Sequence, residues 1–549
     1  MSNFYNSQQP NQGYPNQGYP NQGYSNQGYS NQGYPPQQSY SPGSNAPPVY
    51  HSGYESTHAP LINPKYTTAG SPLPSKIVET RRWNDLWAAL LFILCLAAFA
   101  YAAYLGVPKT LASFQPGQVT SARGFTLALT ASQIAYPIAI LLAVSVVLTF
   151  LWFILIQAFP RQMIKISYWA SCLMLVATGV YVIILGGTTN IVIGVVILLV
   201  AALYAWSYVV IRYKIPFASI MLETTTSISR QFPATILAGF IGMVITIGFM
   251  IVWFITVYGI NLILSNSNST VTTSTGQVNT GGIATYAGIG IVFVFMLYWT
   301  LQVVQNTVHV TCSGLFATVY FTGTEIPGSK KIHVPVPHPT MRAAGYALTT
   351  SFGSVCYGSL LIAIIQTLRY LARMAERDAA QDGNWILCLL MCCIQCILAC
   401  LEDILNYFNH YAFTQVAIYG KNYCEAAKST WNLFVERGFE AIINDNLVDN
   451  VISLGGLCVG VLSALVAFFI VDIDKTIPQT TGYYIAYCVV GFLLGASCFY
   501  SMMSVVTSGV SATFVCIADE PATMEKLKPE LFERLRATWP DISWPIQRV

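Results

Sequence analysis

Residues 385–412 read WILCLLMCCIQCILACLEDILNYFNHYA, and no Gly or Pro interrupts the chain before Gly420. Roughly the first 16 residues are apolar enough for a membrane interior, and at ~1.5 Å per residue Glu402 lies ~25 Å along the predicted helix. This position is near one edge of a hydrocarbon layer ~30 Å thick. A carboxylate there is costly unless it faces the bundle interior, water or a partner charge. The stretch therefore predicts a membrane helix that continues into a polar surface.

The composition extends this interpretation to the whole chain. Of 549 residues, 54% are hydrophobic and only 9% are charged, whereas a soluble protein has about 25% charged residues. The formal net charge of +3 is too small to predict a nucleic-acid partner. We therefore predict an all-α polytopic membrane protein with about ten transmembrane helices, a disordered N-terminal tail and the lipid bilayer as its solvent.

Three segments are predicted. Residues 1–75 are rich in Gln, Tyr and Pro and nearly free of aliphatic residues, so they cannot bury a core and are predicted to be a disordered cytosolic tail. The tail is either an interaction segment or a tolerated low-complexity extension, and its length ahead of the first apolar run predicts no cleavable signal peptide. Residues 84–511 are predicted to form a ten-helix transporter domain, and residues 512–549 a cytosolic C-terminal tail. The NQGY sequence recurs at 11–14, 16–19, 21–24, 26–29 and 31–34.

The apolar runs are long enough to cross a bilayer, for which about 20 residues are needed. If the N-terminus is cytosolic, twenty Lys and Arg residues lie inside and six lie outside, so the positive-inside rule favours cytosolic termini. In the same topology the sequon Asn268-Ser269-Thr270 lies outside, and it predicts glycosylation of Asn268. The predicted spans are 84–106, 133–158, 164–186, 190–211, 234–264, 283–312, 345–371, 385–409, 447–471 and 482–511.

Residues 428–444 follow the eighth predicted span and have an apolar and a polar face. Trp431, Phe434 and Val435 fall on an apolar stripe, and Glu436 and Arg437 fall opposite. We predict a cytosolic amphipathic helix that lies along the membrane or covers the cytosolic mouth of the bundle.

No catalytic arrangement is predicted. The chain has no phosphate-binding loop of the Walker type, which argues against ATP-driven pumping, and no His and Cys residues at metal-ligand spacing. We therefore predict no enzyme, no cofactor and no metal. Cys388, Cys392, Cys396 and Cys400 share one helix face, and we interpret them as packing residues, with a metal ladder or lipidation as the alternatives.

Polar residues inside the apolar helices are the predicted substrate path. Polar groups at membrane depth mark either a pathway or hydrogen bonds between helices, and the amides fit both roles. Aromatic rings and a carboxylate suit an organic cation, which is held by π-faces and negative charge, although Trp and Tyr also populate membrane interfaces. Glu402 or His309 could titrate in a proton-coupled mechanism. The candidate residues are Trp299, Gln302, Gln305, Asn306, Tyr357, Glu402, Asn406 and Asn409.

The residues from Cys396 to Ala427 resemble a family signature. Cys396-x-x-x-Cys400-Leu-Glu402-x-x-Leu-Asn406-Tyr407-x-Asn409, followed by Gly420-x-Asn422-x-Cys424, is similar to the choline transporter-like family, solute carrier family 44. Blocks at 351–360 and 514–520 agree, and the Gln- and Tyr-rich front end resembles the fungal branch, the pH-nine-sensitive proteins.

The resemblance implies a plasma-membrane transporter for choline or a related small cation. Animal members carry an acid in the sixth span where this chain has Gln302, so the substrate does not transfer directly. We expect a non-ATP-driven carrier, with proton coupling left open. The alternative is a membrane scaffold or sensor without transport, whose protein partners the sequence does not indicate.

Overall fold

A computed structural model describes residues 82–113, 131–268, 280–326 and 331–538. In these ranges ten helices are long and apolar enough to cross a membrane, which confirms the predicted fold class. The predicted tail at 1–75 lies outside the described residues, as do residues 539–549.

The described elements are almost all helical. The only sheet among them is a two-stranded antiparallel hairpin that pairs Thr324 with His333. The helices are α1 (Leu86–Ser113), α2 (Ala131–Ala158), α3 (Pro160–Ile184), α4 (Thr188–Ile211), α5 (Ile215–Gln231), α6 (Ala234–Asn268), α7 (Thr280–Thr322), α8 (Pro339–Leu348), α9 (Phe352–Gln381), α10 (Trp385–Tyr419), α11 (Tyr423–Ile473), α12 (Thr481–Asp519), α13 (Pro521–Leu527) and α14 (Pro529–Thr538), and the strands are β1 (Thr324–Glu325) and β2 (Ile332–His333).

The predicted span at 345–371 is wrong at both ends. α8 ends at Leu348 and α9 begins at Phe352, so the chain turns inside the predicted span. The turn is stabilised from outside, because the backbone N–H of Asn84 donates to the Thr350 carbonyl at 3.2 Å. At its other end α9 continues to Gln381, where charged residues extend the helix beyond its apolar part.

The predicted separate helix at 428–444 is also corrected. α11 runs without a break from Tyr423 to Ile473, because no Pro interrupts the chain between this segment and the ninth span. Phe434 stacks on Tyr407 of α10, with ring centroids 5.5 Å apart, whereas Trp431 and Val435 are exposed. The apolar stripe therefore contacts the bundle at Phe434 but does not lie on it as a whole.

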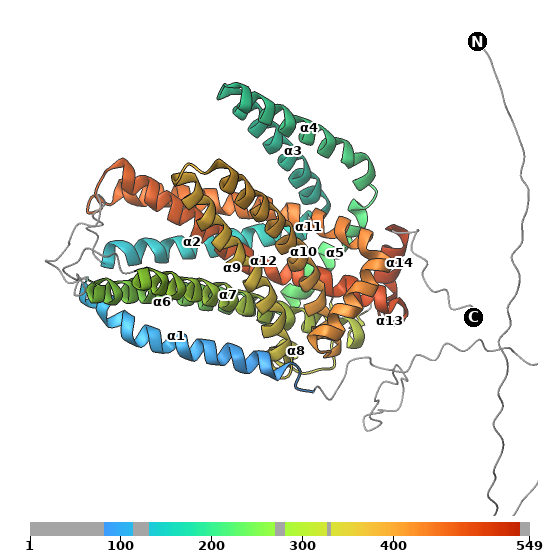
Figure 1. Cartoon of the computed structure of the whole chain (residues 1–549). Coiled ribbons are helices and arrows are strands. Elements are labelled where there is room, and N and C mark those ends of the chain that lie inside the picture. The colour runs from blue at the N-terminus through green and yellow to red at the C-terminus, as the bar shows by residue number, and fades with distance from the viewer. Residues whose placement is uncertain (1–81, 114–130, 269–279, 327–330, 539–549) are drawn as a thin grey trace, which may run out of the picture. The chain divides into compact units, whose positions relative to one another are not determined.

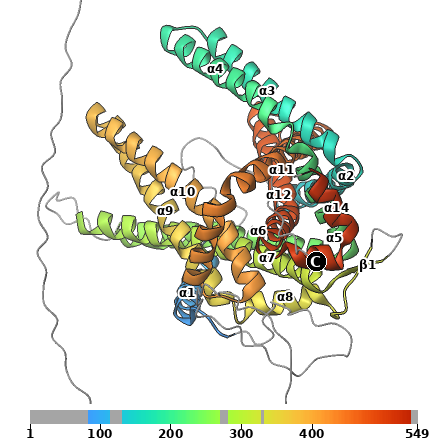
Figure 2. The ribbon, with the colours of Figure 1, turned by 90° about the vertical axis from the view of Figure 1, so that its right-hand side faces the viewer.

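We use the term base for the end of the bundle at which α1 begins and at which α10 and α12 end. At the base the short helices α13 and α14 pack against α7 and α5 (Figure 1). The pair α3–α4 leans away from the other helices in both views (Figures 1 and 2). Most of its large apolar side chains are exposed, as expected of a surface that faces lipid.

Lys528 joins the C-terminal helices to the end of α7. Its Nζ atom is buried and donates to the carbonyl oxygens of Tyr320 at 2.9 Å and Gly323 at 2.8 Å. Carbonyl groups at a helix C-terminus lack partners within the helix and attract a cation. Burial lowers the pKa of the Lys528 ammonium to about 8, and the nearby Glu325 carboxylate opposes this shift.

Glycines let α11 and α12 approach closely. A Cβ atom at Gly491 would lie 2.8 Å from the Cβ of Ala467 and 2.9 Å from the carbonyl oxygen of Ser463. We expect Gly491→Ala to lower the free energy of unfolding by about 1–3 kcal/mol, although Ala is the better helix former. Gly290→Ala is the matched control, because a Cβ there meets nothing within 4 Å. Thermal unfolding in detergent tests this, and equal effects of the two substitutions would contradict it.

Candidate functional site

A cavity of about 450 Å³ lies between five of the long helices. Its size is within the range of small-molecule sites, about 300–1,000 Å³. α7, α9, α10, α11 and α12 all contribute to its wall. The lining residues are Gln302, Gln305, Asn306, Ile362, Asn406, Tyr407, Asn409, His410, Asp445, Val448, Asp449, Thr507 and Val510.

Five of the eight residues selected from the sequence meet in this cavity. The polar face of α7 supplies Gln302, Gln305 and Asn306, and one turn of α10 supplies Asn406 and Asn409. Residues three or four apart lie on the same side of a helix, so each group presents its amides together. α7 and α10 therefore supply uncharged polar groups to the cavity wall.

Two of these amides also hold helices together. Asn306 Nδ2 donates to Ser359 Oγ at 2.9 Å, and Asn409 Nδ2 donates to the Gly358 carbonyl at 3.2 Å. Both acceptors belong to α9. The two roles considered for the amides, path and helix contact, thus occur in the same side chains.

The other three selected residues lie outside the cavity wall. Trp299 is fully buried beside Phe92 of α1, and its Nε1 donates to the Cys356 carbonyl at 3.1 Å. Tyr357 lies at the base between the rings of Trp87 and Tyr423, 4.9 Å from each. Neither aromatic ring faces the cavity, so they form no aromatic cage with its polar groups.

Glu402 is held by partners on α9. Its two carboxylate oxygens accept from Arg369 Nη1 at 2.7 Å and from Gln366 Nε2 at 2.9 Å. The ion pair is largely withdrawn from solvent, with side-chain exposures of 30% for Arg369 and 12% for Glu402. Glu402 lies one helical turn from Asn406, on the side of the cavity away from the base. The pair thus connects α9 and α10 next to the cavity.

Two carboxylates that were not among the residues selected from the sequence also line the cavity. Asp445 and Asp449 lie one turn apart on α11, and Asp445 Oδ2 accepts from the Tyr411 hydroxyl at 2.7 Å. Burial raises the pKa of Asp445 to about 7; the Asp449 carboxylate adds to the rise and the Tyr411 hydroxyl opposes it. Their spacing at the start of an apolar run could have revealed them, since an acid at a membrane edge is costly.

A pair of histidines joins the cavity wall to the buried interior. The rings of His309 and His410 lie 4.0 Å apart, and His410 lines the cavity. His309 Nδ1 is 2.7 Å from Ser508 Oγ, and His410 Nε2 is 2.9 Å from Ser511 Oγ. Each ring is thus bound to α12 by a hydroxyl group.

The cysteine face of α10 does not pack within the chain, so that prediction is wrong. Cys392, Cys396 and Cys400 are exposed and Cys388 is half-buried, on the half of α10 that runs beside α9 and away from the remaining helices (Figure 2). An apolar helix face looks the same in sequence whether protein or lipid covers it. Within the described residues no group of three or more His, Cys, Asp or Glu side chains is placed to hold a metal ion.

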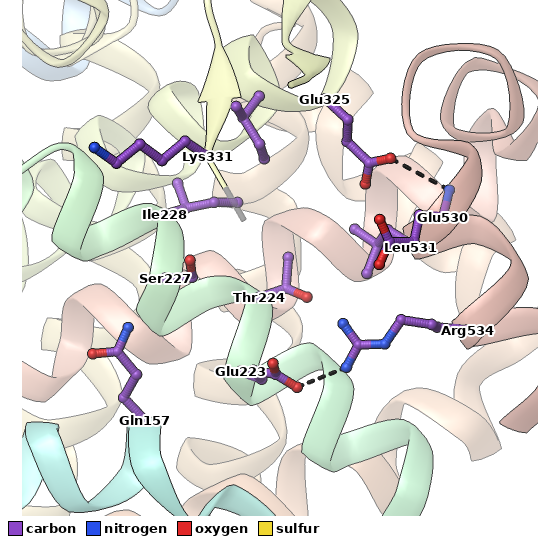
Figure 3. A pocket seen from close by; sticks show the side chains of 11 residues that line it. Gln157, Glu223, Thr224, Ser227, Ile228, Glu325, Lys331, Glu530, Leu531 and Arg534 are labelled. Atoms are coloured by element: carbon purple, nitrogen blue, oxygen red, sulfur yellow. Dashed lines mark hydrogen bonds and ion pairs between the residues drawn. The ribbon is translucent and has the colours of Figure 1, made fainter. Parts of the chain in front are cut away.

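A second cavity, of about 340 Å³, lies at the base between α5, α14 and the β1–β2 hairpin. Polar groups on its two sides bind one another. Arg534 Nη2 pairs with Glu223 Oε2 at 2.8 Å, and the Glu530 backbone N–H donates to Glu325 Oε2 at 3.3 Å (Figure 3). These contacts fasten α14 to its neighbours. We interpret this cavity as a structural contact region between α14, α5 and the hairpin, and not as a ligand site.

Comparisons with known proteins agree with the geometry. A family profile described as plasma-membrane choline transporter matches residues 195–522. A CTL-like protein of Dictyostelium discoideum is 31% identical over 466 residues, which cover 83% of this chain and 76% of that protein. Protein PNS1 of Yarrowia lipolytica is 30% identical over 505 residues, 90% of this chain and 84% of that protein. The chain belongs to the choline transporter-like family.

Membership of the choline transporter-like family confirms the predicted resemblance, including the likeness to fungal relatives. A further PNS1 protein, from Gibberella zeae, is 28% identical over 519 residues, which are 93% of each chain. Together with the ten apolar helices of the described residues, this identifies a multi-pass membrane transporter. Its substrate is a small molecule, and the bilayer is its environment.

Proposed function

We propose that the protein is a plasma-membrane carrier, not driven by ATP, for choline or another small organic cation. The observation that carries this proposal is the cavity itself: two carboxylates, one Tyr ring and a set of neutral amides meet in about 450 Å³. A quaternary ammonium cannot donate hydrogen bonds, so it is bound by negative charge and by the faces of aromatic rings. Asp445, Asp449 and Tyr407 supply these groups.

Asp445 and Asp449 also compensate for the neutral residue at Gln302, where the family resemblance implies an acid. The family resemblance implies an acid in the sixth span of animal relatives, and this chain has a neutral amide, Gln302, there. Gln302 of α7 lines the same cavity as Asp445 and Asp449 of α11. We propose that the negative charge that balances the substrate is supplied from α11 in this chain.

We propose an alternating-access mechanism in which the Glu402–Arg369 pair closes the cavity on the side away from the base. The pair joins α9 to α10 one turn beyond Asn406, where an ion pair with low solvent access is strong enough to hold two helices together. Opening on that side then requires α9 and α10 to separate. Glu402 acts in this proposal as a gate residue that does not bind the substrate directly.

The orientation and segments predicted from the sequence complete the proposal. We propose that the base faces the cytosol, that both termini are cytosolic, and that residues 1–75 and 512–549 flank the transporter domain at 84–511. Asn268 is the last residue of α6, and its side chain is outside the described residues. We propose glycosylation of Asn268 on the outer side.

Uptake of radiolabelled choline into proteoliposomes tests the function. We expect saturable uptake that empty liposomes lack, and we expect Asn406→Ala to raise KM by about tenfold, as for loss of one buried polar contact. Asn190→Ala is the matched control, because Asn190 lies away from the cavity and donates to the Gly186 carbonyl between α3 and α4. If folded protein gives no uptake of choline or related cations, the carrier proposal fails and a scaffold or sensor role replaces it.

A further inference from the structure

The two residues before α1 are tied to the bases of three other helices. Asp85 Oδ2 accepts from Ser354 Oγ of α9 at 2.6 Å and from the backbone N–H of Tyr423, the first residue of α11, at 2.9 Å. Asn84 Nδ2 donates to the carbonyl of Gly420, just after α10, at 2.8 Å. A segment of two residues therefore joins α1 to α9 and to the α10–α11 turn.

The backbone at this point takes an uncommon conformation to make these contacts. Asp85 has φ of 51°, in the left-handed region that few residues other than Gly adopt without strain. Asp and Asn are among the residues that tolerate it best. The chain also approaches α9 very closely, because a Cβ at Gly353 would lie 2.2 Å from the Asn84 carbonyl oxygen. Backbone strain persists where surrounding contacts impose it, and here the imposed result is the position of the Asp85 carboxylate.

The contacts of Asp85 continue to the cavity. Tyr423, whose N–H binds Asp85, donates its own hydroxyl to Asn409 Oδ1, and Asn409 lines the cavity. On the other side Trp87 packs against Tyr357, which packs against Tyr423. Asp85 is therefore two contacts away from the cavity wall and does not touch the cavity.

We propose that Asp85 is a positioning residue that latches the base of the transporter closed, by holding the start of α1 against α9 and the α10–α11 turn. In this arrangement the latch fixes Tyr423 and, through it, Asn409. An opening of the base that moves α1 away must break both hydrogen bonds to the carboxylate, and one that moves the α10–α11 turn alone must break the bond from the Tyr423 N–H. That the latch gates a transport path rests on the proposed function; that it closes the base does not.

A buried native cysteine reports the state of the latch. Cys356 of α9 is fully buried in a cluster with Ala88 and Phe92 of α1, so release of the start of α1 exposes it. Cys516 is fully buried in a different cluster, on α12, and Cys424 at the base is exposed. The three thiols distinguish release of the latch from unfolding and from poor access of the reagent.

The test is the rate at which a water-soluble maleimide labels each cysteine of the purified full chain, measured by peptide mass spectrometry. We expect Asp85→Ala to raise the rate at Cys356 by about tenfold to a hundredfold, which corresponds to loss of charge-assisted hydrogen bonds. Asp85→Asn keeps an acceptor oxygen and tolerates the left-handed backbone, so it should fall between wild type and Asp85→Ala. Asp85→Gly relieves the strain but has no acceptor, and should resemble Asp85→Ala.

The controls make the result decisive. Cys424, which is already exposed, should stay accessible in every variant, and Cys516 should stay protected. Asp378→Ala removes an exposed carboxylate at the other end of α9 and should leave Cys356 protected. If Cys356 keeps its wild-type rate in Asp85→Ala, the latch is refuted. If Asp85→Ala exposes Cys516 as well, the variant has unfolded more widely. Ser354→Ala, which removes one donor to Asp85 and keeps the carboxylate, then replaces it, and the labelling rates of Cys356 and Cys516 are compared in the same way.

Transport kinetics then separate positioning from substrate contact. Asp85→Asn should change the maximal rate of cation uptake by more than about threefold and change KM less than Asn409→Ala does, because Asp85 reaches the cavity only through Tyr423 and Asn409. Asn409→Ala should mainly raise KM. An absence of uptake in all proteins would refute the proposed function alone, since the labelling experiment uses no substrate.

Discussion

Asp445→Asn is expected to lower the uptake of a small organic cation by about tenfold to a hundredfold, the effect of removing one charged partner of the cation. Asp445 lines the cavity, and its carboxylate is fixed by the Tyr411 hydroxyl at 2.7 Å. The Asn side chain keeps the shape and can accept the same hydrogen bond, so the loss reports charge. Uptake of choline into proteoliposomes at equal protein content measures it.

The same substitution should remove a dependence on pH. The pKa of Asp445 is raised to about 7 because the carboxyl group is buried. Below pH 7 at the base the group gains a proton and loses its charge, so wild-type uptake should rise as pH increases from about 6 to 8. Asp445→Asn should be low and flat through this range. Asp382→Asn, at the turn between α9 and α10, is the matched acid outside the cavity and should behave as wild type.

The raised pKa of Asp445 also predicts how the stability of the protein changes with pH. A carboxyl group whose pKa is higher in the folded state than the usual 3.8 binds more protons when folded. The contribution of Asp445 to stability therefore falls as pH rises from about 4 to about 7. Thermal unfolding of wild type should show this fall more strongly than Asp445→Asn. Parallel curves for the two proteins would contradict the assignment of the raised pKa to Asp445.

The long helices could be predicted because their signal is local. A run of some 20 apolar residues has one low-energy structure in a bilayer, so the predicted spans 190–211 and 234–264 agree closely with the apolar parts of α4, Thr188–Ile211, and of α6, Ala234–Leu264. The turn at Thr349–Ser351 could not be predicted, because it depends on a hydrogen bond from Asn84, more than 260 positions earlier in the chain. Tertiary contacts of this kind leave no periodic pattern in the sequence.

The site was predictable in part for the same reason. Gln302, Asn306 and Asn406 interrupt apolar helices, and their polarity alone marks them as residues that avoid lipid. Whether a buried polar or aromatic group then faces a cavity or a neighbouring helix depends on packing. Trp299 faces α1 and α9, whereas Asp449 enters the cavity from the start of the predicted span 447–471.

Arg369→Gln is expected to destabilise the fold on the order of 2 kcal/mol and to open the cavity on the side away from the base. The substitution leaves the Glu402 carboxylate, 12% exposed, with Gln366 as its remaining partner. Breaking a fully buried pair costs about 3–5 kcal/mol, and the 30% exposure of Arg369 reduces the expected cost. The double variant Arg369→Gln, Glu402→Gln removes both charges and should recover most of the loss, because two amides can bind each other.

Thermal unfolding of the two single variants and the double variant gives the coupling energy of the pair. Glu402→Gln should cost less than Arg369→Gln, because the remaining guanidinium at Arg369 is the more exposed partner. If the pair is the gate, all three variants should also raise the rate of choline exchange across the membrane while KM stays near its wild-type value. A normal exchange rate with a large coupling energy would make the pair a structural contact, and the gate would then have to lie elsewhere between α9 and α10.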